Sequence, residues 1–477
     1  MQSPPSHSDR PTVPLSQLEE RPLDVLVIGG GIVGAGVARD AAMRGLRTGL
    51  VEQHDFASGT SSRSSRLLHG GLRYLAQGRL RLVREAGTEK MVLHRIAPHL
   101  TRPMPFVFPT YRGTEWKLWK LRIGVKIYDR LSAGRNFERS GWLRPADVQC
   151  TVPGLNPHDL TGAVRYYDAV TGDARLVIDT LRSAASHGAT VVNYAPFDRA
   201  ERRGDAWRCA LRDALSGRTF ELTARTVVNA AGAWADRFPQ SRVKLRLTKG
   251  VHLVVPRERL PVPECVVMTE GPRILFAIPW GERTILGTTD TDYAGDPASP
   301  TCEPADAAHV LGVVNRSFPQ ARLHDGDVVS TWAGLRPLIA TKAGRPSDIS
   351  RAHEIHMTEP GWFDVAGGKL TTYRLMAEQA VDRVVSFLGV RAAPCATASE
   401  PLIPNESNPR FSGVVPPAVR REAVEHYCRN EWAVHLDDVL LRRAGWQHYC
   451  DEVPAVARQV AEWMQSCPLS PVLRGEG

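Results

Sequence analysis

The chain has 477 residues, of which 43% are hydrophobic and 23% are charged, and its formal net charge is +9. A chain of this length is too long to fold around a single compact core. Its composition is that of a globular protein, which excludes an extended disordered chain. No apolar run approaches the ~20 residues that span a bilayer. The positive charge favours an anionic partner: nucleic acid, an acidic membrane surface, or a substrate with phosphate or carboxylate groups.

The eight cysteines lie far apart, with no CxxC pair and no zinc-type spacing. We therefore expect reduced thiols in a cytoplasmic protein and no metal site. Residues 1–20 are polar and rich in Pro and Ser, and they lack the apolar core of a secretory signal. We expect them to form a disordered tail.

Residues 24–52, DVLVIGGGIVGAGVARDAAMRGLRTGLVE, predict a strand, a glycine-rich turn, a helix and a second strand. Gly29, Gly31 and Gly34 form a G-x-G-x-x-G pattern, which permits a sharp turn, close approach to a pyrophosphate and tight helix packing. Glu52 ends the second strand, where an acid accepts hydrogen bonds from an adenosine ribose and disfavours NADP. The unit predicts a dinucleotide site, and the fingerprint alone leaves FAD and NAD open.

A basic stretch with two tryptophans, WKLWKLRIGVKIYDRL, spans residues 116–131. Two interpretations stay open. The helix could dock on an anionic membrane surface. It could equally pack on the body of the protein with its charges in water, because its apolar residues are spread broadly around the helix.

Short β-rich runs between residues 188 and 290 predict an antiparallel substrate-covering sheet, together with strands that return to the nucleotide fold. Two later segments are candidates to contact the nucleotide, although both could be ordinary glycine turns. The first, TVVNAAGAWAD at 226–236, contains Ala231 and Gly232. The second, at 367–372, contains Gly368, Lys369, Leu370 and Thr371, and a helix that begins there would stabilise negative charge on a reduced flavin. An N-terminal fingerprint with such returning segments favours a flavoprotein.

A proline-rich linker at 401–417 precedes helical patterns that predict a small C-terminal domain at 401–477. The predicted fold class is α/β, with a Rossmann-like FAD-binding domain interleaved with an antiparallel-sheet substrate domain, plus a small all-α C-terminal domain. The FAD-binding domain and the substrate domain share residues 21–400, with the substrate domain at approximately 75–170 and 240–345.

Several stretches resemble the FAD-dependent glycerol-3-phosphate dehydrogenases, in the family's order across residues 20–400. They are VIGGGIVGAGVARDAAMRGL, GTSSRSSRLLHGGLRYL (59–75), RIGVKIYD (122–129), DARLV (173–177), VVNAAGAW, KGVHLVVP (249–256), AIPWGERTILGTTDTDY (277–293), GLRPL (334–338) and GGKLTTYR (367–374). The resemblance implies FAD as cofactor. It also implies oxidation of sn-glycerol 3-phosphate to dihydroxyacetone phosphate by hydride transfer to flavin N5, with the electrons passed to a quinone.

The resemblance also implies site residues. Around the flavin it places Thr60, Ser61, Ser62, Ser65, Arg66, Leu67, Gly70 and Gly71. At the substrate it places Arg73, Tyr74, Arg336 and Arg351, together with His252 and Lys369. The base is either His252, whose pKa range suits proton transfer, or Lys369, which could instead stabilise the developing alkoxide. Each arginine could also be an ordinary ion-paired residue, and His252 a half-buried structural histidine.

Two departures from the family stand out. The C-terminal domain at 401–477 is shorter than the family's, which puts contacts with partner subunits and electron acceptors in doubt. Arg66 stands where the family has a lysine, so the positive charge is kept but becomes a planar fork.

The partners that we expect are glycerol 3-phosphate, a quinone or another electron acceptor, the surface of the cytoplasmic membrane, and a second copy of the chain in a homodimer. Three other functions stay open: an oxidase that uses oxygen, an enzyme that oxidises an amine or amino acid, and a flavin-binding homologue without catalysis. Nucleic-acid binding is disfavoured, because the arginines are dispersed and no RNA or DNA motif is visible.

Overall fold

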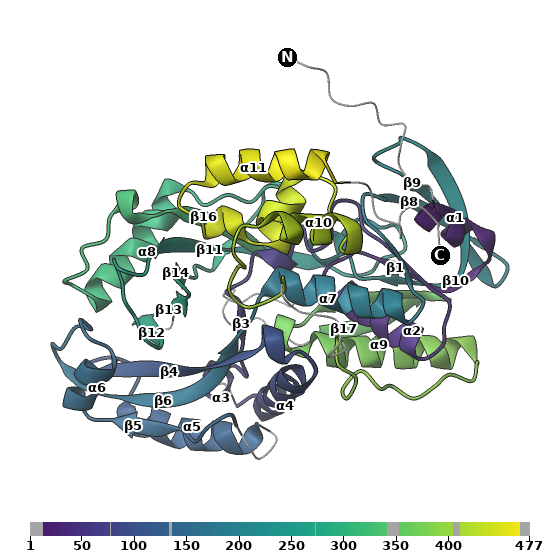
Figure 1. Cartoon of the computed structure of the whole chain (residues 1–477). Coiled ribbons are helices and arrows are strands. Elements are labelled where there is room, and N and C mark those ends of the chain that lie inside the picture. The colour runs from purple at the N-terminus through teal and green to yellow at the C-terminus, as the bar shows by residue number, and fades with distance from the viewer. Residues whose placement is uncertain are drawn as a thin grey trace.

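The computed structural model describes residues 13–76, 78–132, 136–271, 273–340, 353–403 and 411–467. The chain folds around two β-sheets, with helices packed against both (Figure 1). The chain passes between the sheets several times, so neither sheet is built from one continuous stretch of sequence.

The first sheet is mostly parallel. Along the sheet, its strands are β17 (His353–Glu359), β18 (Trp362–Gly367), β10 (Thr219–Asn229), β1 (Leu23–Ile28), β2 (Thr48–Val51) and β7 (Thr190–Val192). An antiparallel ribbon of β8 (Phe197–Arg203) and β9 (Ala206–Arg212) extends from β10. Strand β1 pairs in parallel with both β10 and β2, which places the ends of these strands at one edge of the sheet.

The second sheet is mostly antiparallel. Along its main path the strands are β15 (Thr291–Asp292), β11 (Leu245–Pro256), β14 (Arg283–Gly287), β13 (Arg273–Trp280), β12 (Cys265–Glu270), β4 (Arg102–Tyr111), β6 (Leu160–Val170) and β3 (Leu67–Leu68). Strand β16 (Ser330–Ile339) pairs with β11, and β5 (Gly141–Leu143) pairs with β6. In the register of β11 with β16, His252 lies directly opposite Trp332.

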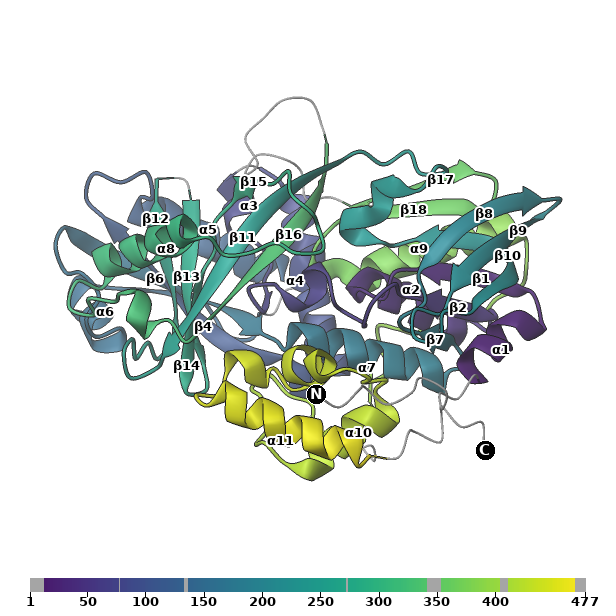
Figure 2. The same cartoon turned by 90° about the horizontal axis from the view of Figure 1, so that it is seen from above.

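The helices cover the sheets and connect them (Figure 2). Within the described residues the α-helices are α1 (Val13–Glu20), α2 (Ile32–Met43), α3 (Arg73–Ala76), α4 (Leu80–Ile96), α5 (Leu118–Leu131), α6 (Pro145–Thr151), α7 (Asp173–Ser186), α8 (Pro304–Ser317), α9 (Tyr373–Leu388), α10 (Arg421–Asn430) and α11 (Val453–Gln465). The predicted α/β fold is confirmed by this architecture.

Strand β1 shows why the N-terminal unit folds as its sequence predicts. Val25 and Val27 pack in the core that contains residues of α2, α7 and α9. Leu26 and Ile28 point the other way, into the core that contains Trp207. Because both faces of the strand are covered, all four residues from Val25 to Ile28 are apolar instead of alternating with polar residues.

Helix α1 corrects the expectation that residues 1–20 form a disordered tail. Leu15 and Leu18, three positions apart and so on one face of the helix, are buried beside Leu23 in the core that also contains Trp207. Burial of this apolar face stabilises the helix, although the overall composition of the segment is polar. Residues 1–12 lie outside the described part of the chain.

The C-terminal helices pack beside α7, as the two views agree (Figures 1 and 2). Buried ion pairs join them to the rest of the molecule. The Arg175 guanidinium of α7 lies 2.5 Å from the Glu431 carboxylate, and that of Arg443 lies 2.6 Å from Asp55. An ion pair buried in this way is costly to break, because the remaining charge would be left in a poorly solvated place.

Candidate functional site

The glycine-rich turn between β1 and α2 is tightly packed. Gly29 has φ = +107°, a conformation that favours glycine. A Cβ atom on Gly34 would lie 1.9 Å from the carbonyl oxygen of Gly29, so no larger residue fits there. The turn thus brings the start of α2 up to the end of β1. The backbone N–H of Ile32, at that helix start, donates to Ser61 Oγ at 3.0 Å.

Glu52 follows β2 and faces the same turn. Its carboxylate accepts hydrogen bonds from the backbone N–H groups of Gly30, at 2.7 Å, and His54, at 3.0 Å. Burial raises the pKa of Glu52, and these two hydrogen bonds oppose that shift. The carboxylate is therefore fixed beside the glycine turn, where it can accept a hydrogen bond from a ligand hydroxyl group.

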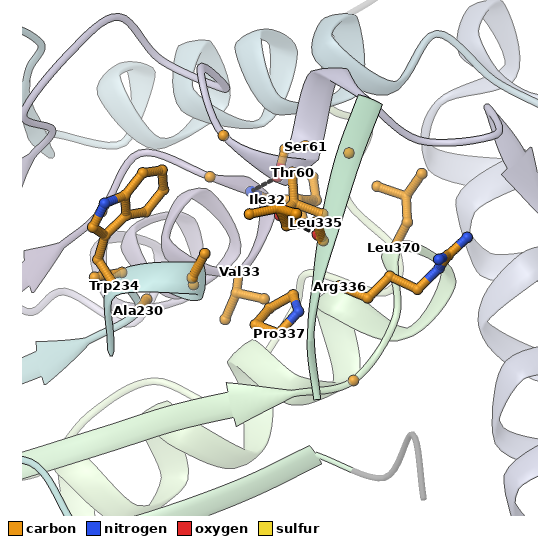
Figure 3. A pocket seen from close by; sticks show the side chains of 18 of the residues that line it. Ile32, Val33, Thr60, Ser61, Ala230, Trp234, Leu335, Arg336, Pro337 and Leu370 are labelled. Carbon is orange, nitrogen blue, oxygen red and sulfur yellow. Dashed lines mark hydrogen bonds between the residues drawn. The ribbon is translucent and has the colours of Figure 1, made fainter. Parts of the chain in front are cut away.

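A long cavity runs from this turn to the junction of the two sheets. Trp234 and Ala230 lie at one end of the view in Figure 3, and Arg336 and Leu370 lie at the other. Fifteen of the residues predicted for the site line it: Gly29, Gly31, Glu52, Thr60, Ser61, Ser65, Leu67, Ala231, Gly232, His252, Arg336, Gly368, Lys369, Leu370 and Thr371. The structure thus gathers residues from across the chain into one elongated cavity.

Other predicted residues lie outside this lining. Gly34 packs against Gly29, as described, and Ser62 ends a short turn of 3-10 helix, Thr60–Ser62. The N–H of Gly70 donates to the Tyr128 hydroxyl at 2.8 Å. Gly71 belongs to a neighbouring cavity.

Arg66 is also absent from the lining, contrary to its expected place along the flavin. It has φ = +55°, and its guanidinium lies 4.3 Å from the ring centroid of Trp280 and 5.2 Å from that of Trp332. Its Nε lies 3.6 Å from the Asp173 carboxylate. Arg66 therefore supports the wall behind the cavity through cation–π contacts.

Two predicted substrate arginines have no described side chain. Arg73 is the first residue of α3, and its side chain lies outside the described part of the structure. Arg351 lies outside the described residues altogether. Their roles stay predictions.

His252 is buried in the cavity wall. Its Nε2 lies 2.8 Å from Ser65 Oγ, and its ring stacks on Trp332 with centroids 5.1 Å apart and an interplanar angle of 18°. Within the described residues, Nδ1 has no hydrogen-bond partner. Burial and the positive charges of Arg336 and Arg66 lower the pKa of His252 to about 3. The imidazole is consequently neutral near pH 7.

Arg336 is held in a defined orientation. One Nη donates to the Thr288 hydroxyl at 3.1 Å, and the other contacts the Thr289 carbonyl oxygen at 3.2 Å and the Asp290 carboxylate at 3.3 Å. Arg336 lines both the long cavity and its neighbour. A guanidinium fixed in this way can present its planar fork to an anionic ligand.

The sequence analysis did not identify the residues that hold Arg336. Thr288, Thr289 and Asp290 belong to the segment TTDTDY (288–293), which directly follows β14. A run of polar residues immediately after an apolar strand is the signal that could have found them, because loops at strand ends commonly carry binding residues.

The neighbouring cavity, of about 760 Å³, shares Ser65, Leu67, His69 and Arg336 with the long cavity. Its wall includes the aromatic side chains of Phe106, Phe108, Tyr166 and Phe276. Tyr74 lines it as well, and the Lys369 ammonium lies 3.9 Å from the centroid of the Tyr74 ring. The two cavities therefore meet at Arg336 and at Ser65, the hydrogen-bond partner of His252.

The residues present fit FAD. An elongated cavity starts at a glycine turn and a helix N-terminus, which suit a pyrophosphate, and continues past a carboxylate that suits a ribose. At the far end, the turn that contains Gly368 leads directly into α9, so a helix N-terminus also points to that region.

Comparisons with known proteins agree with this geometry. The model of the family described as "FAD dependent oxidoreductase" matches residues 24–383. The chain is 42% identical to glycerol-3-phosphate dehydrogenase 2 of Mycobacterium tuberculosis over 393 residues, which are 80% of this chain and 66% of that protein. It is 37% identical to the aerobic glycerol-3-phosphate dehydrogenase of Staphylococcus haemolyticus over 402 residues, 81% of this chain and 72% of that protein.

A solved structure is similar over nearly its whole length. The X-ray structure of glycerol-3-phosphate dehydrogenase from Bacillus halodurans complexed with FAD has a TM-score of 0.76 and 30% identity, covering 95% of this chain and 92% of that one. The chain therefore spans just under two thirds of the mycobacterial relative but most of this solved chain.

Proposed function

Because this chain belongs to the FAD-dependent glycerol-3-phosphate dehydrogenase family, we propose that it oxidises sn-glycerol 3-phosphate to dihydroxyacetone phosphate and passes the electrons to a quinone. FAD is the cofactor, and when bound it supplies the acceptor for the hydride that leaves the substrate carbon. The observation that carries the proposal is that a neutral buried imidazole, His252, and a fixed guanidinium, Arg336, line the same cavity.

In this proposal Gly29, Gly31 and the start of α2 hold the pyrophosphate, and Glu52 binds the adenosine ribose. The segment at 60–67 and the turn at 368–371 lie along the flavin. Three facts support these roles. Apart from Ser62 and Arg66, these residues line one cavity. The backbone N–H of Gly30 fixes the Glu52 carboxylate, and Thr60 Oγ1 donates to the Leu335 carbonyl oxygen at 2.7 Å across the cavity wall.

His252 acts as the base in the proposed reaction. Its Nε2 lies 2.8 Å from Oγ of Ser65, a residue that lines both cavities, so the substrate hydroxyl would take the place of the serine hydroxyl at this nitrogen. A substrate hydroxyl that reaches Nε2 can give up its proton there as hydride leaves the carbon. Lys369 is the alternative base, and it can instead stabilise the developing alkoxide from its place beside Tyr74.

Arg336 binds the substrate phosphate, with Arg73 and Arg351 as proposed partners. Thr288 and Asp290 hold the guanidinium before substrate arrives, so little of its freedom is lost on binding. The phosphate lies away from the reacting carbon, and its binding energy therefore serves to orient that carbon.

An anaerobic titration tests cofactor, substrate and competence together. The purified protein should show a flavin absorption spectrum, and glycerol 3-phosphate should bleach it in the absence of oxygen, whereas glycerol at the same concentration should not. A protein that binds FAD but stays oxidised with excess glycerol 3-phosphate would be a flavin-binding homologue without this activity.

A quinone acceptor requires access to a membrane surface, and helix α5 supports this part of the proposal. Leu121, Val125 and Tyr128 form its buried face. On another face Trp119, Ile123 and Ile127, spaced four residues apart, are 43–62% exposed. The apolar residues of α5 thus lie on two faces of the helix, one buried and one exposed.

The exposed face of α5 is also basic. The side chains of Lys120 and Arg122 lie over the rings of Trp119 and Trp142, at 5.6 and 4.5 Å, and Trp142 itself is exposed on the neighbouring strand β5. Exposed aromatic and aliphatic side chains beside lysine and arginine suit an interface with anionic lipids, such as the inner face of the cytoplasmic membrane. Every described helix is too short or too polar to cross a bilayer, so this contact would be peripheral.

Sedimentation with anionic vesicles tests the surface contact. The double variant Trp119→Ser, Ile123→Ser should lose binding, whereas Met357→Ser, which changes an exposed apolar residue on β17, should keep it. Turnover with a soluble quinone and without hydrogen peroxide would support the quinone acceptor. Hydrogen peroxide formed in proportion to turnover without quinone would identify an oxidase.

A further inference from the structure

The ring of His252 rests on Trp332, the residue opposite it on strand β16. Among the described residues, Ser65 is the hydrogen-bond partner of the His252 ring, at Nε2. One hydrogen bond allows a ring to turn about the bond direction. The plane of the imidazole is therefore set by the flat surface against which it stacks, and that surface is the indole of Trp332.

Trp332 is held from several sides. Its Nε1 donates to the Ser64 carbonyl oxygen at 3.2 Å, and the Arg66 guanidinium lies against its ring. The ring of His448, from the C-terminal helical segment, lies 5.0 Å from the indole centroid at an interplanar angle of 48°. The position of the Trp332 indole thus depends on a residue more than one hundred positions later in the chain.

The side chain of His448 is itself held against strand β16, which contains Trp332. Its Nδ1 lies 2.7 Å from Ser330 Oγ, and Ser330 precedes Trp332 by two positions on β16. Side chains two positions apart on a strand project from the same face, so His448 spans the Ser330 hydroxyl and the Trp332 ring. The neighbouring Tyr449 contacts a different tryptophan, Trp280, with centroids 5.0 Å apart.

We propose that His448 is a positioning residue for His252 and acts through Trp332, so that the C-terminal helical segment completes the catalytic site. The inference rests on the proposed function, in which His252 takes the proton. His448 holds the indole plane, the indole holds the imidazole plane, and the imidazole plane sets the direction of Nε2. Rotation of that plane moves the base out of line with the substrate hydroxyl, and small misplacements of catalytic groups reduce rates strongly.

Two matched variants isolate the ring of His448. His448→Leu and His448→Phe both remove the hydrogen bond to Ser330, and both place an apolar side chain beside the Trp332 ring at a half-buried position, so both should fold. Only phenylalanine supplies a flat ring against Trp332. Tyr449→Phe serves as a control, because it removes the hydrogen bond from the Glu282 N–H and weakens the docking of the same segment without touching Trp332.

The first readout is the NMR signal of His252 in FAD-loaded enzyme labelled at its histidines, assigned with His252→Gln. The signal should shift in His448→Leu and stay near its parent position in His448→Phe and Tyr449→Phe. This measurement needs no turnover, so it decides the positional claim even if glycerol 3-phosphate is not the substrate.

The second readout is steady-state kinetics with glycerol 3-phosphate. His448→Leu should lower kcat roughly tenfold and leave KM within about twofold, because the phosphate-binding group Arg336 is not moved. His448→Phe should recover most of kcat. An unchanged His252 signal in His448→Leu, equal kcat in the leucine and phenylalanine variants, or a similar loss in Tyr449→Phe would each overturn the proposal.

Discussion

Asp55 accepts hydrogen bonds from two nitrogens of Arg443, at 2.6 and 2.8 Å, although 388 residues separate them in the sequence. Arg442 donates to the same carboxylate. Asp55 lies in the loop after β2, between Glu52 and Gly59, which both line the cofactor cavity. The C-terminal segment therefore supports the loop that the adenosine end of FAD would contact.

Replacing Asp55 with alanine should leave Arg443 buried without its main partner. We expect the free energy of unfolding to fall by about 3–5 kcal/mol, the usual cost of breaking a buried pair. FAD should also dissociate more readily. Urea unfolding, followed by flavin fluorescence, measures both. Glu201→Gln, which removes an exposed pair with Arg203, should change stability by less than about 1 kcal/mol. An unchanged urea midpoint in Asp55→Ala would contradict this account of the loop.

A methyl group at Gly34 should disrupt the cofactor turn. Its carbon would overlap the Gly29 carbonyl oxygen, so α2 would have to move away from β1. We expect Gly34→Ala to be purified with little FAD, as measured by the ratio of flavin to protein absorbance. Gly124→Ala provides the control, because Gly124 lies within α5 with open space around it and alanine favours helix by roughly 0.5–1 kcal/mol. FAD content equal in both variants would show that the turn tolerates a side chain.

Removal of the Arg336 guanidinium should weaken the binding of a phosphorylated substrate. A hydrogen bond to a charged group contributes about 1.5–3 kcal/mol, so kcat/KM for glycerol 3-phosphate should fall roughly 100-fold in Arg336→Ala. Arg336→Lys should recover only part of the lost kcat/KM, because lysine restores the positive charge without the planar fork of the guanidinium. Arg421→Ala, at an exposed position on α10, controls for loss of positive charge. Activity of Arg336→Ala close to that of the parent enzyme would remove Arg336 from the phosphate site.

Two histidines, the buried His252 and the half-buried His448, should make the fold sensitive to acid. Burial, with nearby arginines, lowers the pKa of both His252 and His448 from 6.5 to about 3. Between pH 6.5 and 3 the unfolded chain binds a proton at each position while the folded chain does not, so stability is lost as the pH falls through this window.

Each of these histidines should contribute a slope of up to about 1.4 kcal/mol per pH unit. His448→Phe should therefore show a shallower loss of unfolding free energy than the parent protein between pH 7 and 4.5, measured by urea unfolding at each pH. Parallel curves for the two proteins would mean that His448 is not held neutral by the fold.

The cofactor turn could be predicted from sequence because every interaction that defines it is local or periodic. Gly29 and Gly34 lie five residues apart, and Glu52 directly follows the next strand, β2. The apolar run of β1 and the periodicity of α2 predict the strand and the helix on either side of the turn. The family match and the similar solved structure with FAD confirm the predicted α/β fold and FAD as cofactor.

Other features depend on contacts that no local pattern records. Arg66 lies between Trp280 and Trp332, from strands more than two hundred residues away, and so leaves the cavity that its neighbours line. The stacking of His252 on Trp332 follows from the pairing of β11 with β16. Helix α1 orders because Leu18 packs on Leu23 and Gly49, which its own composition cannot show.

The link between Asp55 and Arg443 also constrains the order of events during synthesis. A ribosome delivers the glycine turn and Glu52 early, but the guanidinium that neutralises Asp55 is added 388 positions after that carboxylate. Until then the loop beside the nucleotide carries a carboxylate without its counterion. We therefore expect stable capture of the flavin only after Arg443 has been synthesised, and not in the nascent N-terminal half.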